Sequence, residues 1–574
     1  MISFRIDIAD AHAHLFRVTL TIPRPAPQQR VSLPVWIPGS YLVREFARHL
    51  SGLQARQGGR ELPARQLDKA SWQVETDGKA ALVVAYTVYA FDTSVRTAFL
   101  DARRGFFNGT SLCLRVEGRE AEPHQLELGN LPRDWEVATA MTSVGKGRYQ
   151  AEGYDEFVDH PVELGSFWRG RFEAQGVEHE FVVAGALPDF DGERLLADSK
   201  RICETAIAFW HGRQKPPFDR YVFMLNAVDD GYGGLEHRAS TALIAARRDL
   251  PQRGKTELTD SYVTLLGLIS HEYFHTWNVK RLKPREFEAY DYTAENYTEL
   301  LWFFEGFTSY YDDLLLVRAG LIDESRYLKL VAKTITGVLG LPGRRLQSVA
   351  QASFDAWVKY YRNDENTPNA TISYYTKGAL VALALDLTLR AERGSLDELM
   401  RALWARSGGG PIAESDIREV LHEVAGRSLD SELQAFVHGT DDLPLQGLLE
   451  RAGVAWQAQA PTLSQRLGLR VSESPLTGVK ATHVLRGGPA ERAGVSAGDE
   501  LLAVDGWRIR RLDDALRVLK PGDTGALLLS RDQRVMTLPL VLPREDEAVG
   551  TVALAVDAKA PRPAAALRKA WLEG

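Results

Sequence analysis

The sequence predicts a multidomain α+β protein: an N-terminal antiparallel β domain, then an α+β body, then a small β-rich module. Three observations lead to this prediction. At 574 residues the chain is too long for a single hydrophobic core. The hydrophobic pattern changes from strand-like to helical after about residue 195. Short strand-like runs then return near residue 455.

Residues 1–170 are predicted to form the β domain. His12–Ile22 and Ala81–Phe91 are rich in β-branched and aromatic residues, which favour strands. Turn-forming stretches such as RPAPQQ, IPGS and LPRD separate runs of this kind. The pattern indicates a large antiparallel sheet.

Residues 171–450 are predicted to form the α+β body. Arg194–Gly212 has helical spacing and ends at a glycine. Arg220–Asp229 returns to a strand pattern, and Ser240–Leu250 is a strand that can pair with it. Long helical segments then follow, at Thr259–Val279, Glu299–Ala319, Glu324–Leu339, Gly378–Arg393 and Leu396–Ser407. A strand pair followed by helices indicates an α+β arrangement.

Residues 455–545 are predicted to form a separate module. Its expected strands are Gly468–Ser474, Val479–Leu485, Asp499–Ile509 and Arg534–Leu542. Leu512–Leu519 has helical spacing, and Gly487–Asp499 reads as a turn with a short helix. Residues 546–574 are rich in alanine and proline, and we expect them to be a peripheral tail.

The composition, with 45% hydrophobic and 25% charged residues, is typical of a soluble globular protein. The formal charge of -7 is mild and basic residues are scattered, so neither nucleic acid nor an anionic membrane is favoured as a partner. Two cysteines cannot form a disulfide framework, and no apolar run approaches ~20 residues. The first residues lack a secretory signal pattern. We expect a cytoplasmic protein without a membrane span, or a periplasmic one if a leader was trimmed.

The strongest chemical signal is the H-E-x-x-H pattern of His271, Glu272 and His275. Residues four apart on a helix are rotated by roughly 40° and separated by ~6 Å, so the two imidazoles can converge on one point. Neutral imidazoles at this spacing supply two ligands of a tetrahedral zinc site. Glu272 points to the side, where it can reach a water at the metal. Such a pattern can arise by chance, so a third ligand is needed.

Glu305 is the candidate for the third ligand. It lies in an aromatic helical run, between Phe304 and Gly306, where a carboxylate is costly unless it is paired or bound to a metal. Gly306 would let another backbone come close. Asp312 lies seven residues on, on the same helical face, and could orient a ligating imidazole. The alternatives are an exposed helix-start carboxylate for Glu305 and an unrelated surface residue for Asp312.

These motifs resemble the glycyl aminopeptidase family of zinc metallopeptidases, distant relatives of aminopeptidase N. The segments HEYFHTWNVKRLKP and LWFFEGFTSYYDDL carry the resemblance, together with Pro34–Leu50, Gly233–His237 and Tyr374–Asp386. It spans roughly residues 30–545. It implies a thermolysin-like zinc peptidase domain with a helical extension over residues 171–450, and one Zn²⁺ per chain.

The resemblance also implies the roles of individual residues. Glu272 is the expected general base. Glu236 would bind the α-ammonium of the substrate, while Gly233 and Gly234 let the strand backbone approach the peptide. In this segment His237 replaces the asparagine of aminopeptidase N, so the grip on the terminal amine is less secure. The alternative for Glu236 is a plain turn residue.

Tyr375 is the expected phenol that stabilises the oxyanion of the tetrahedral intermediate. Tyr374 is the rival, because one residue of register decides which ring faces the site. Either could instead be an ordinary packed tyrosine. The basic residues Lys280, Arg281 and Lys283 could contact a peptide, but we expect a solvated helix end.

The C-terminal module resembles a PDZ domain of the type found in bacterial proteases. Leu467, Gly468 and Leu469 would form the loop that receives a C-terminal carboxylate, with the peptide added as a strand. Leu512 would present an apolar surface to that peptide. The alternative is that the module only packs against the body and binds nothing.

Together these features predict a zinc aminopeptidase that releases small N-terminal residues, glycine or alanine, from peptides with a free N-terminus. One alternative is a zinc endopeptidase or oligopeptidase that uses the PDZ domain to hold the substrate C-terminus. Another is a catalytically inactive PDZ adaptor, which the complete set of His271, Glu272, His275 and Glu305 argues against.

Overall fold

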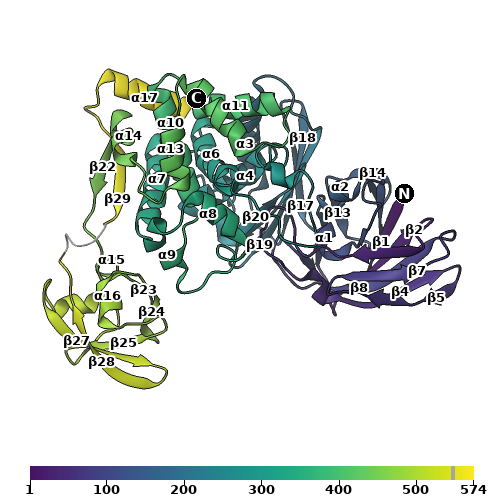
Figure 1. The fold of residues 1–574 in the computed structure, drawn as a ribbon, viewed down its shortest axis with the longest axis horizontal. Helices are drawn as coiled ribbons and strands as arrows, with labels where there is room; N and C mark the ends of the chain where they lie inside the picture. The colour runs from purple at the N-terminus through teal and green to yellow at the C-terminus, as the bar shows by residue number, and fades with distance from the viewer. Residues whose placement is uncertain (545–549) are drawn as a thin grey trace. The chain divides into compact units, whose positions relative to one another are not determined.

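The computed structural model describes residues 1–544 and 550–574. The chain forms two compact units, one of Met1–Tyr297 with Trp404–Ile412 and one of Thr298–Leu403 with Ala413–Gly574. Figure 1 labels the elements of both. Within the described ranges no helix has the length and apolar character needed to cross a membrane.

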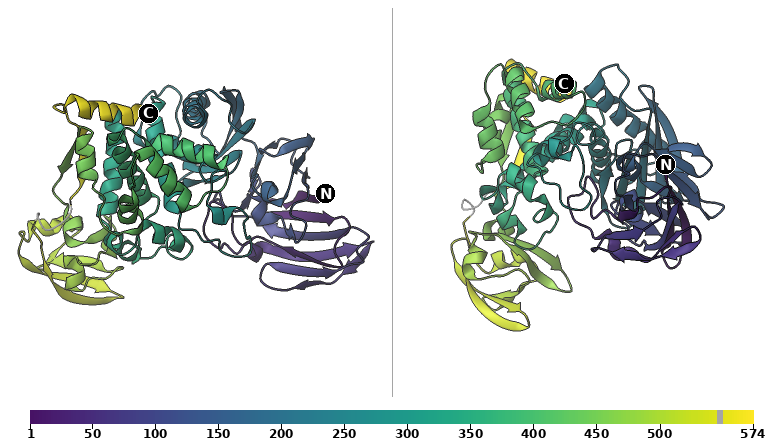
Figure 2. Two further views of the ribbon diagram at one scale, coloured as in Figure 1. Left: turned by 45° about the horizontal axis from the view of Figure 1, so that its top comes forward. Right: turned by 45° about the vertical axis from the view of Figure 1, so that its right-hand side comes forward.

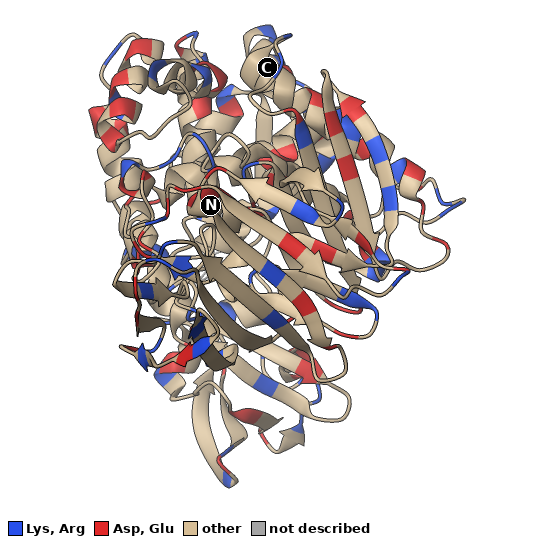
Figure 3. Cartoon of the chain, turned by 90° about the vertical axis from the view of Figure 1, so that its right-hand side faces the viewer, with Lys and Arg blue, Asp and Glu red and all other residues tan. Residues whose placement is uncertain are grey.

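The first unit begins with an eight-stranded sheet in the order β14-β15-β12-β1-β2-β8-β4-β5. The expected runs form β2 (Leu15–Ile22) and β8 (Leu82–Tyr89), which pair antiparallel. The sheet also holds one parallel pair, β1 (Ile2–Asp10) with β12 (His124–Gly129). Its other strands are β4 (Leu50–Gln57), β5 (Arg60–Leu62), β14 (Thr142–Gly145) and β15 (Arg148–Ala151). Figure 3 shows acidic and basic residues interspersed along the strands, as the scattered charge predicts.

Two four-stranded sheets complete this β domain. One runs β13-β16-β10-β9 and the other β11-β3-β7-β6. Alternate residues of the large sheet point inward, so that Phe16, Val18 and Leu20 of β2 are fully buried in a shared core. The strands are β3 (Gln28–Ser32), β6 (Ala64–Gln66), β7 (Ser71–Glu75), β9 (Ala98–Leu100), β10 (Arg104–Phe107), β11 (Arg115–Val116), β13 (Glu136–Ala138) and β16 (Val162–Gly165).

A five-stranded sheet in the order β17-β18-β19-β21-β20 carries the predicted strand pair. The pairing of β19 (Arg220–Val228) with β21 (Ser240–Ala246) is confirmed, and it is parallel. The short strand β20 (Tyr232–Glu236) runs antiparallel to β21 and forms one edge. The other strands are β17 (Trp168–Ala174) and β18 (Val177–Ala184), and the helices of this region are α3 (Gly192–His211) and α4 (Asp260–Phe274). Helix α4 contacts α3 and β20.

The second unit is mainly helical up to residue 451. The expected helix Glu299–Ala319 is divided into α5 (Leu301–Phe304) and α6 (Gly306–Arg318). A Cβ placed on Gly306 would lie 2.6 Å from the Cα of Gly378, so the predicted close backbone approach at this glycine is confirmed. The remaining helices include α7 (Glu324–Leu339), α8 (Val349–Phe354), α9 (Thr367–Ala370), α10 (Thr376–Ala391), α11 (Leu396–Ser407), α12 (Glu414–Ala425), α13 (Asp430–Leu433) and α14 (Leu445–Arg451).

The C-terminal module has its own sheet, β23-β24-β25-β27-β28, and its own apolar core. Strand β27 (Thr524–Arg531) was missed, because its leucines 527–529 are consecutive and do not alternate. The expected helix at Leu512–Leu519 is a 3₁₀-helix over Leu512–Arg517. The other elements are α15 (Leu463–Leu467), β23 (Leu469–Ser474), β24 (Gly478–Val484), α16 (Pro489–Ala493), β25 (Glu500–Val504), β26 (Trp507–Arg508) and β28 (Arg534–Val541).

The expectation of a peripheral tail is wrong for residues 552–573. Strand β29 (Val552–Val556) pairs with β22 (Val454–Ala458), and α17 (Arg562–Glu573) packs on α10 and α6. Figure 2 shows α17 as the yellow helix at the C-terminus. Trp571 of α17 is fully buried and its indole N–H donates to the hydroxyl of Tyr310 at 2.9 Å. An alanine-rich segment is compatible with a packed amphipathic helix when its few large residues share one face.

Candidate metal centre and substrate strand

The two histidines of the H-E-x-x-H pattern lie at the C-terminal end of α4. The helix ends at Phe274, earlier than expected, and His275 is its C-cap. The N–H of His275 still donates to the carbonyl of His271 at 3.2 Å, so the helical spacing of the pair is kept. The two Nε2 atoms are 3.0 Å apart. His275 is 1% exposed, whereas His271 remains partly accessible.

The hydrogen bonds of His275 fix which of its ring nitrogens can bind a metal. Nδ1 lies 2.7 Å from the carbonyl oxygen of Asn278, which can only accept, so Nδ1 carries the proton. The lone pair of Nε2 is therefore directed at Nε2 of His271. An imidazole oriented by a backbone carbonyl is the usual arrangement of a metal-ligating histidine.

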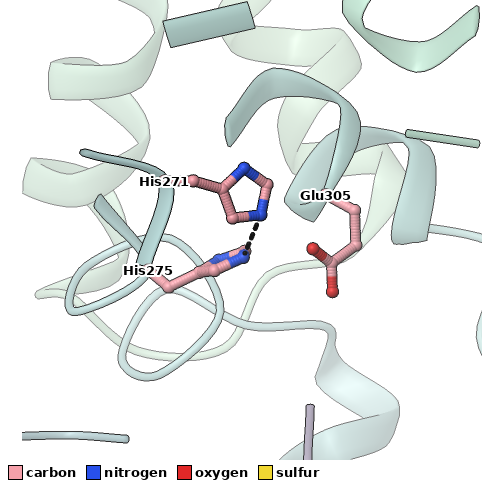
Figure 4. A group of neighbouring side chains, drawn as sticks. All are labelled: His271, His275 and Glu305. Atoms are coloured by element: carbon pink, nitrogen blue, oxygen red, sulfur yellow. Dashed lines mark hydrogen bonds between the residues drawn. The ribbon is translucent and has the colours of Figure 1, made fainter. Parts of the chain in front are cut away.

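Glu305 completes the group. It lies between α5 and α6 and is 1% exposed. The candidate ligand atoms of His271, His275 and Glu305 all lie within 4.8 Å of one another. Figure 4 shows the three side chains directed toward one another. Two neutral imidazoles and one carboxylate fit zinc, which binds such sets with a fourth position open. Their role as ligands stays a prediction.

The edge strand β20 holds Glu236 and Gly234. The N–H of His237 donates to the carbonyl of Ser240, so this pair is hydrogen-bonded across the hairpin. Bonded and non-bonded pairs alternate along an antiparallel ladder, so Glu236 and Gly234 direct their backbone groups away from β21. These groups lie on the open edge, where a peptide strand can add.

Glu272 lies directly against this strand. A Cβ placed on Gly234 would be 2.1 Å from Oε1 of Glu272, so a side chain here would displace the Glu272 carboxylate. Glu272 and Glu236 are 5% and 4% exposed. The predicted amine-binding carboxylate, Glu236, is therefore on β20. The predicted general base, Glu272, lies against the same strand two residues away, at Gly234.

A loop of the β domain contacts the Glu236 side chain. Gly39, at a φ of 93°, approaches so closely that a Cβ there would be 2.4 Å from Oε1 of Glu236. This loop belongs to the family-like segment Pro34–Leu50, but the place of Gly39 beside Glu236 was not predicted. The Pro38-Gly39 dipeptide is a turn signal, which indicates a bend without indicating what it contacts.

Asp159, which was also not predicted, connects the residues that follow β20 with those that follow α4. Its carboxylate accepts from Nδ1 of His237 at 3.0 Å, from Nε of Arg238 at 2.8 Å and from Nζ of Lys280 at 2.7 Å. Burial alone would raise the pKa of Asp159, but Lys280 and Arg238 outweigh it and hold that pKa well below its usual range. The N–H of Lys280 donates to the carbonyl of His275. The network thus links Glu236 and His275 through their neighbours.

The expectation of a solvated basic end after α4 is wrong. Only 5% of the Lys280 side chain is exposed, because it is paired with Asp159. Arg281 donates to the carbonyls of Arg238 and Thr276, and Lys283 lies over the ring of Tyr290. A buried acid on a segment more than 100 residues away provides the partner that the local sequence does not reveal.

The candidate phenols lie at the start of α10. Tyr375 is its N-cap, and Tyr374 is fully buried beside it, with ring centroids 4.8 Å apart. Burial, followed by the charge of Glu305, raises the pKa of Tyr375 well above its ordinary value. Its phenol therefore stays protonated and able to donate. The choice of Tyr375 over Tyr374 stays a prediction, as does the orienting role of Asp312.

The proposed carboxylate loop of the C-terminal module follows α15. Gly468 has a φ of 68°, and Leu467 and Leu469 are buried. Strand β23 is an edge of its sheet, as strand addition requires. Leu512 does not present the expected apolar surface: it is 4% exposed and belongs to the module's core.

Comparison with known families agrees with this layout. The Peptidase M61 N-terminal domain matches residues 3–166, M61 glycyl aminopeptidase matches residues 264–381, and a PDZ domain matches residues 481–531. The chain resembles an aminopeptidase N family protein from Idiomarina loihiensis, with 39% identity over 100% of both chains and a TM-score of 0.93.

A variant of an M1 zinc metallopeptidase from Deinococcus radiodurans is much less similar. It has 15% identity over 77% of this chain and 95% of its own, with a TM-score of 0.49, which is too low to inform the site. No curated protein matches the chain.

Proposed function

From its membership of the M61 glycyl aminopeptidase family, and hence of the metallo-aminopeptidases, we propose that this chain is a zinc aminopeptidase that releases small N-terminal residues from peptides. The observation that carries the proposal is a pair of carboxylates at β20, one on the strand itself and one on α4 beside it. Glu236 lies at one position of the open edge, and Glu272 lies against Gly234, two residues away. With the peptide ammonium at Glu236, the first peptide bond would lie beside Glu272, so this spacing selects the bond after the first residue.

One Zn²⁺ per chain would be held by His271, His275 and Glu305. Bound zinc would supply Lewis acidity to the attacking water and to the peptide carbonyl. The proton on Nδ1 of His275 is held by Asn278, which leaves Nε2 for the metal. His275 and Glu305 are buried, whereas His271 remains partly accessible.

Glu272 acts in this proposal as the general base. It takes a proton from the attacking water and later passes it to the leaving amine. Its carboxylate occupies the space that a side chain at Gly234 would need, which supports a position beside the scissile bond. Tyr375, protonated at neutral pH, would donate a hydrogen bond to the developing oxyanion.

Glu236 would bind the free α-ammonium by a charge-assisted hydrogen bond. Two residues of a strand span about 7 Å, which is the reach from a terminal amine past the first peptide bond. The loop at Gly39 rests on the Glu236 carboxylate, with no space for a Cβ on Gly39 itself. The preference for glycine or alanine at the first position is proposed from membership of the glycyl aminopeptidase family.

The PDZ module is proposed to receive the C-terminus of longer peptides at Leu467, Gly468 and Leu469. We place the domain boundaries at 1–170, 171–450 and 455–545, which enclose the matched ranges 3–166 and 481–531. A cytoplasmic location is proposed because Cys113 and Cys203 are both free and buried.

Hydrolysis of a free-amine peptide beside its N-acetylated twin tests the proposal. We expect the free-amine peptide to be cleaved at its first bond and the acetylated one to resist cleavage, with metal analysis giving one zinc per chain. Equal rates on both peptides would remove Glu236 from its role and favour the endopeptidase alternative.

A further inference from the structure

Arg96 is held rigidly beside the open edge of β20. It lies in the loop between β8 and β9, and the fully buried Asn108 fixes that loop on both sides of it. Nδ2 of Asn108 donates to the carbonyl of Val95 at 2.9 Å and to that of Thr97 at 3.2 Å. The backbone that presents Arg96 is therefore set before any substrate arrives.

The guanidinium of Arg96 contacts the outward side of the strand. Its Nη2 donates to the carbonyl of Gly234 at 3.2 Å. Its Nη1 and Nη2 would be 3.7 and 3.9 Å from a Cβ on Gly233, so the group lies beside Gly233 as well as Gly234. Because Gly234 directs its carbonyl away from β21, Arg96 lies on the edge where a peptide would add.

The charge of Arg96 is not balanced by an acidic side chain in residues 1–544 and 550–574. Its Nε is buried and finds no hydrogen-bond partner within those ranges. Other arginines nearby differ in this respect: Arg104 is paired with Glu163, and Arg238 with Asp155 and Asp159. Arg96 is partly accessible, so its unpaired cation can be reached by a ligand that supplies the anion.

The position of Arg96 relative to Glu236 and Glu272 indicates which anionic group of a substrate would reach it. With its ammonium at Glu236 and its first peptide bond beside Glu272, a substrate runs antiparallel to β20, toward Gly233 and Tyr232. Arg96, which contacts the strand at Gly234 and Gly233, then lies beside the substrate residue that follows the scissile bond. An extended dipeptide spans about 7 Å, so its C-terminal carboxylate ends there.

We propose that Arg96 is a specificity-determining residue that binds a carboxylate one residue beyond the scissile bond, so that dipeptides with a free C-terminus are preferred substrates. This inference rests on the proposed aminopeptidase function. The planar guanidinium suits a carboxylate, which it can bind through two N–H groups. A dipeptide would thus be recognised at both ends, by Glu236 and by Arg96.

The test compares Ala-Ala with its C-terminal amide, Ala-Ala-NH₂. We expect kcat/KM to be about 10- to 100-fold higher for the free acid, the value of one charge-assisted interaction, and mainly through KM. Arg96→Gln should reduce this ratio to near one, and Arg96→Lys should keep part of it. Arg103→Gln, which changes an exposed arginine of the neighbouring turn, should leave the ratio unchanged.

A third substrate, Ala-Asp-NH₂, identifies the source of the carboxylate. A rate well below that of Ala-Ala supports the chain terminus as the ligand. Equal rates for the two would overturn the dipeptide preference in favour of an acidic second residue. A wild-type ratio of Ala-Ala to its amide within twofold, or an unchanged ratio in Arg96→Gln, would overturn the role of Arg96.

Direct binding separates this inference from the proposed function. Calorimetry with the Glu272→Gln protein reads affinity without turnover. Ala-Ala binding about 10- to 100-fold more tightly than its amide supports the inference, and equal affinities overturn it, even if the wild-type protein hydrolyses neither. Absence of hydrolysis alone would refute the aminopeptidase proposal. If Arg96→Gln does not fold, the same ratio in Arg96→Lys and in the wild type decides the matter.

Discussion

The β20 region and the PDZ loop are both suited to meet the end of a peptide chain, but they are built differently. At β20 the proposed recognition group is a charged side chain, the buried Glu236. The Asp159 network holds His237, the next residue along the chain. In the PDZ module the proposed recognition site is the backbone loop of Leu467, Gly468 and Leu469, on a small separate core. The first design buries charges, and the second avoids them.

This difference has a physical consequence. A buried carboxylate needs its partners, so a change in the β20 region removes both chemistry and stabilising contacts. A backbone loop depends on one φ value and on little else. We therefore expect large effects at β20 and small ones in the PDZ module.

The largest effect is expected for Glu272→Gln. Loss of a general base should lower kcat about 10²- to 10⁴-fold, while the zinc content stays unchanged. Steady-state kinetics with an alanyl peptide measures it, beside Glu288→Gln, an exposed glutamate, as the control. A fully active Glu272→Gln protein would refute the proposed mechanism.

Glu305→Gln should weaken zinc binding more than 100-fold, because loss of an outer partner already costs 10- to 100-fold. Metal analysis after dialysis against a weak chelator measures the loss. Asp312→Asn, on the helix that Glu305 caps, is the matched variant, and its smaller loss would agree with an orienting role. Equal zinc retention in Glu305→Gln and the wild type would exclude Glu305 as a ligand.

Acid should destabilise the first unit through its buried histidines. Burial lowers the pKa of His124 and of His179 to about 4, below the unfolded value of about 6.5. The unfolded chain binds more protons between these values, so the stabilisation is full above pH 6.5 and is lost as the pH falls toward 4. Each histidine contributes up to about 3 kcal/mol to this loss.

Urea unfolding at pH 7 and pH 5 checks this expectation, with hydrogen exchange to assign the transition to the first unit. The free energy of unfolding falls between pH 7 and pH 5, and in His124→Asn this fall should be about 2 kcal/mol smaller. His12→Asn, at an exposed position, should leave it unchanged. The PDZ module, in which His483 is the histidine of residues 455–545, should respond less.

Glu236→Gln should raise KM for free-amine peptides about 10- to 100-fold, because a charge-assisted bond to the ammonium becomes a neutral one. The N-acetylated twin should change little, so the discrimination between the two peptides is the measured quantity. Undiminished discrimination in Glu236→Gln would show that another group reads the amine.

The smallest effect is expected in the PDZ loop. Gly468→Ala strains a left-handed position and brings a Cβ 3.1 Å from Gly488. We expect it to lower the affinity for a C-terminal peptide several-fold, at a stability cost of about 1 kcal/mol. Gly478→Ala, at a φ of 72° with open space around it, carries the same strain without the contact and is the control. Equal peptide affinities in both variants would exclude this loop as the binding site.

Much of the fold and of the metal group could be predicted from the sequence. The strands at β2 and β8 and most of the long helices follow from local periodicity. His271 and His275 converge because helical spacing fixes them, and Glu305 stood out as an acid in an aromatic run. Strand β27 and the packed helix α17 were missed, because consecutive leucines and alanine-rich segments lack a clear period.

The sequence by itself determined the elements and the residues that could act as metal ligands, since both depend on neighbours a few positions apart. Only the tertiary structure decided what surrounds them: Gly39 on Glu236, Asp159 on Lys280, and Arg96 on Gly234. These contacts join segments more than 100 residues apart, and they arise from the burial and pairing of charges. Patterns over a few neighbouring residues cannot predict contacts between such distant segments.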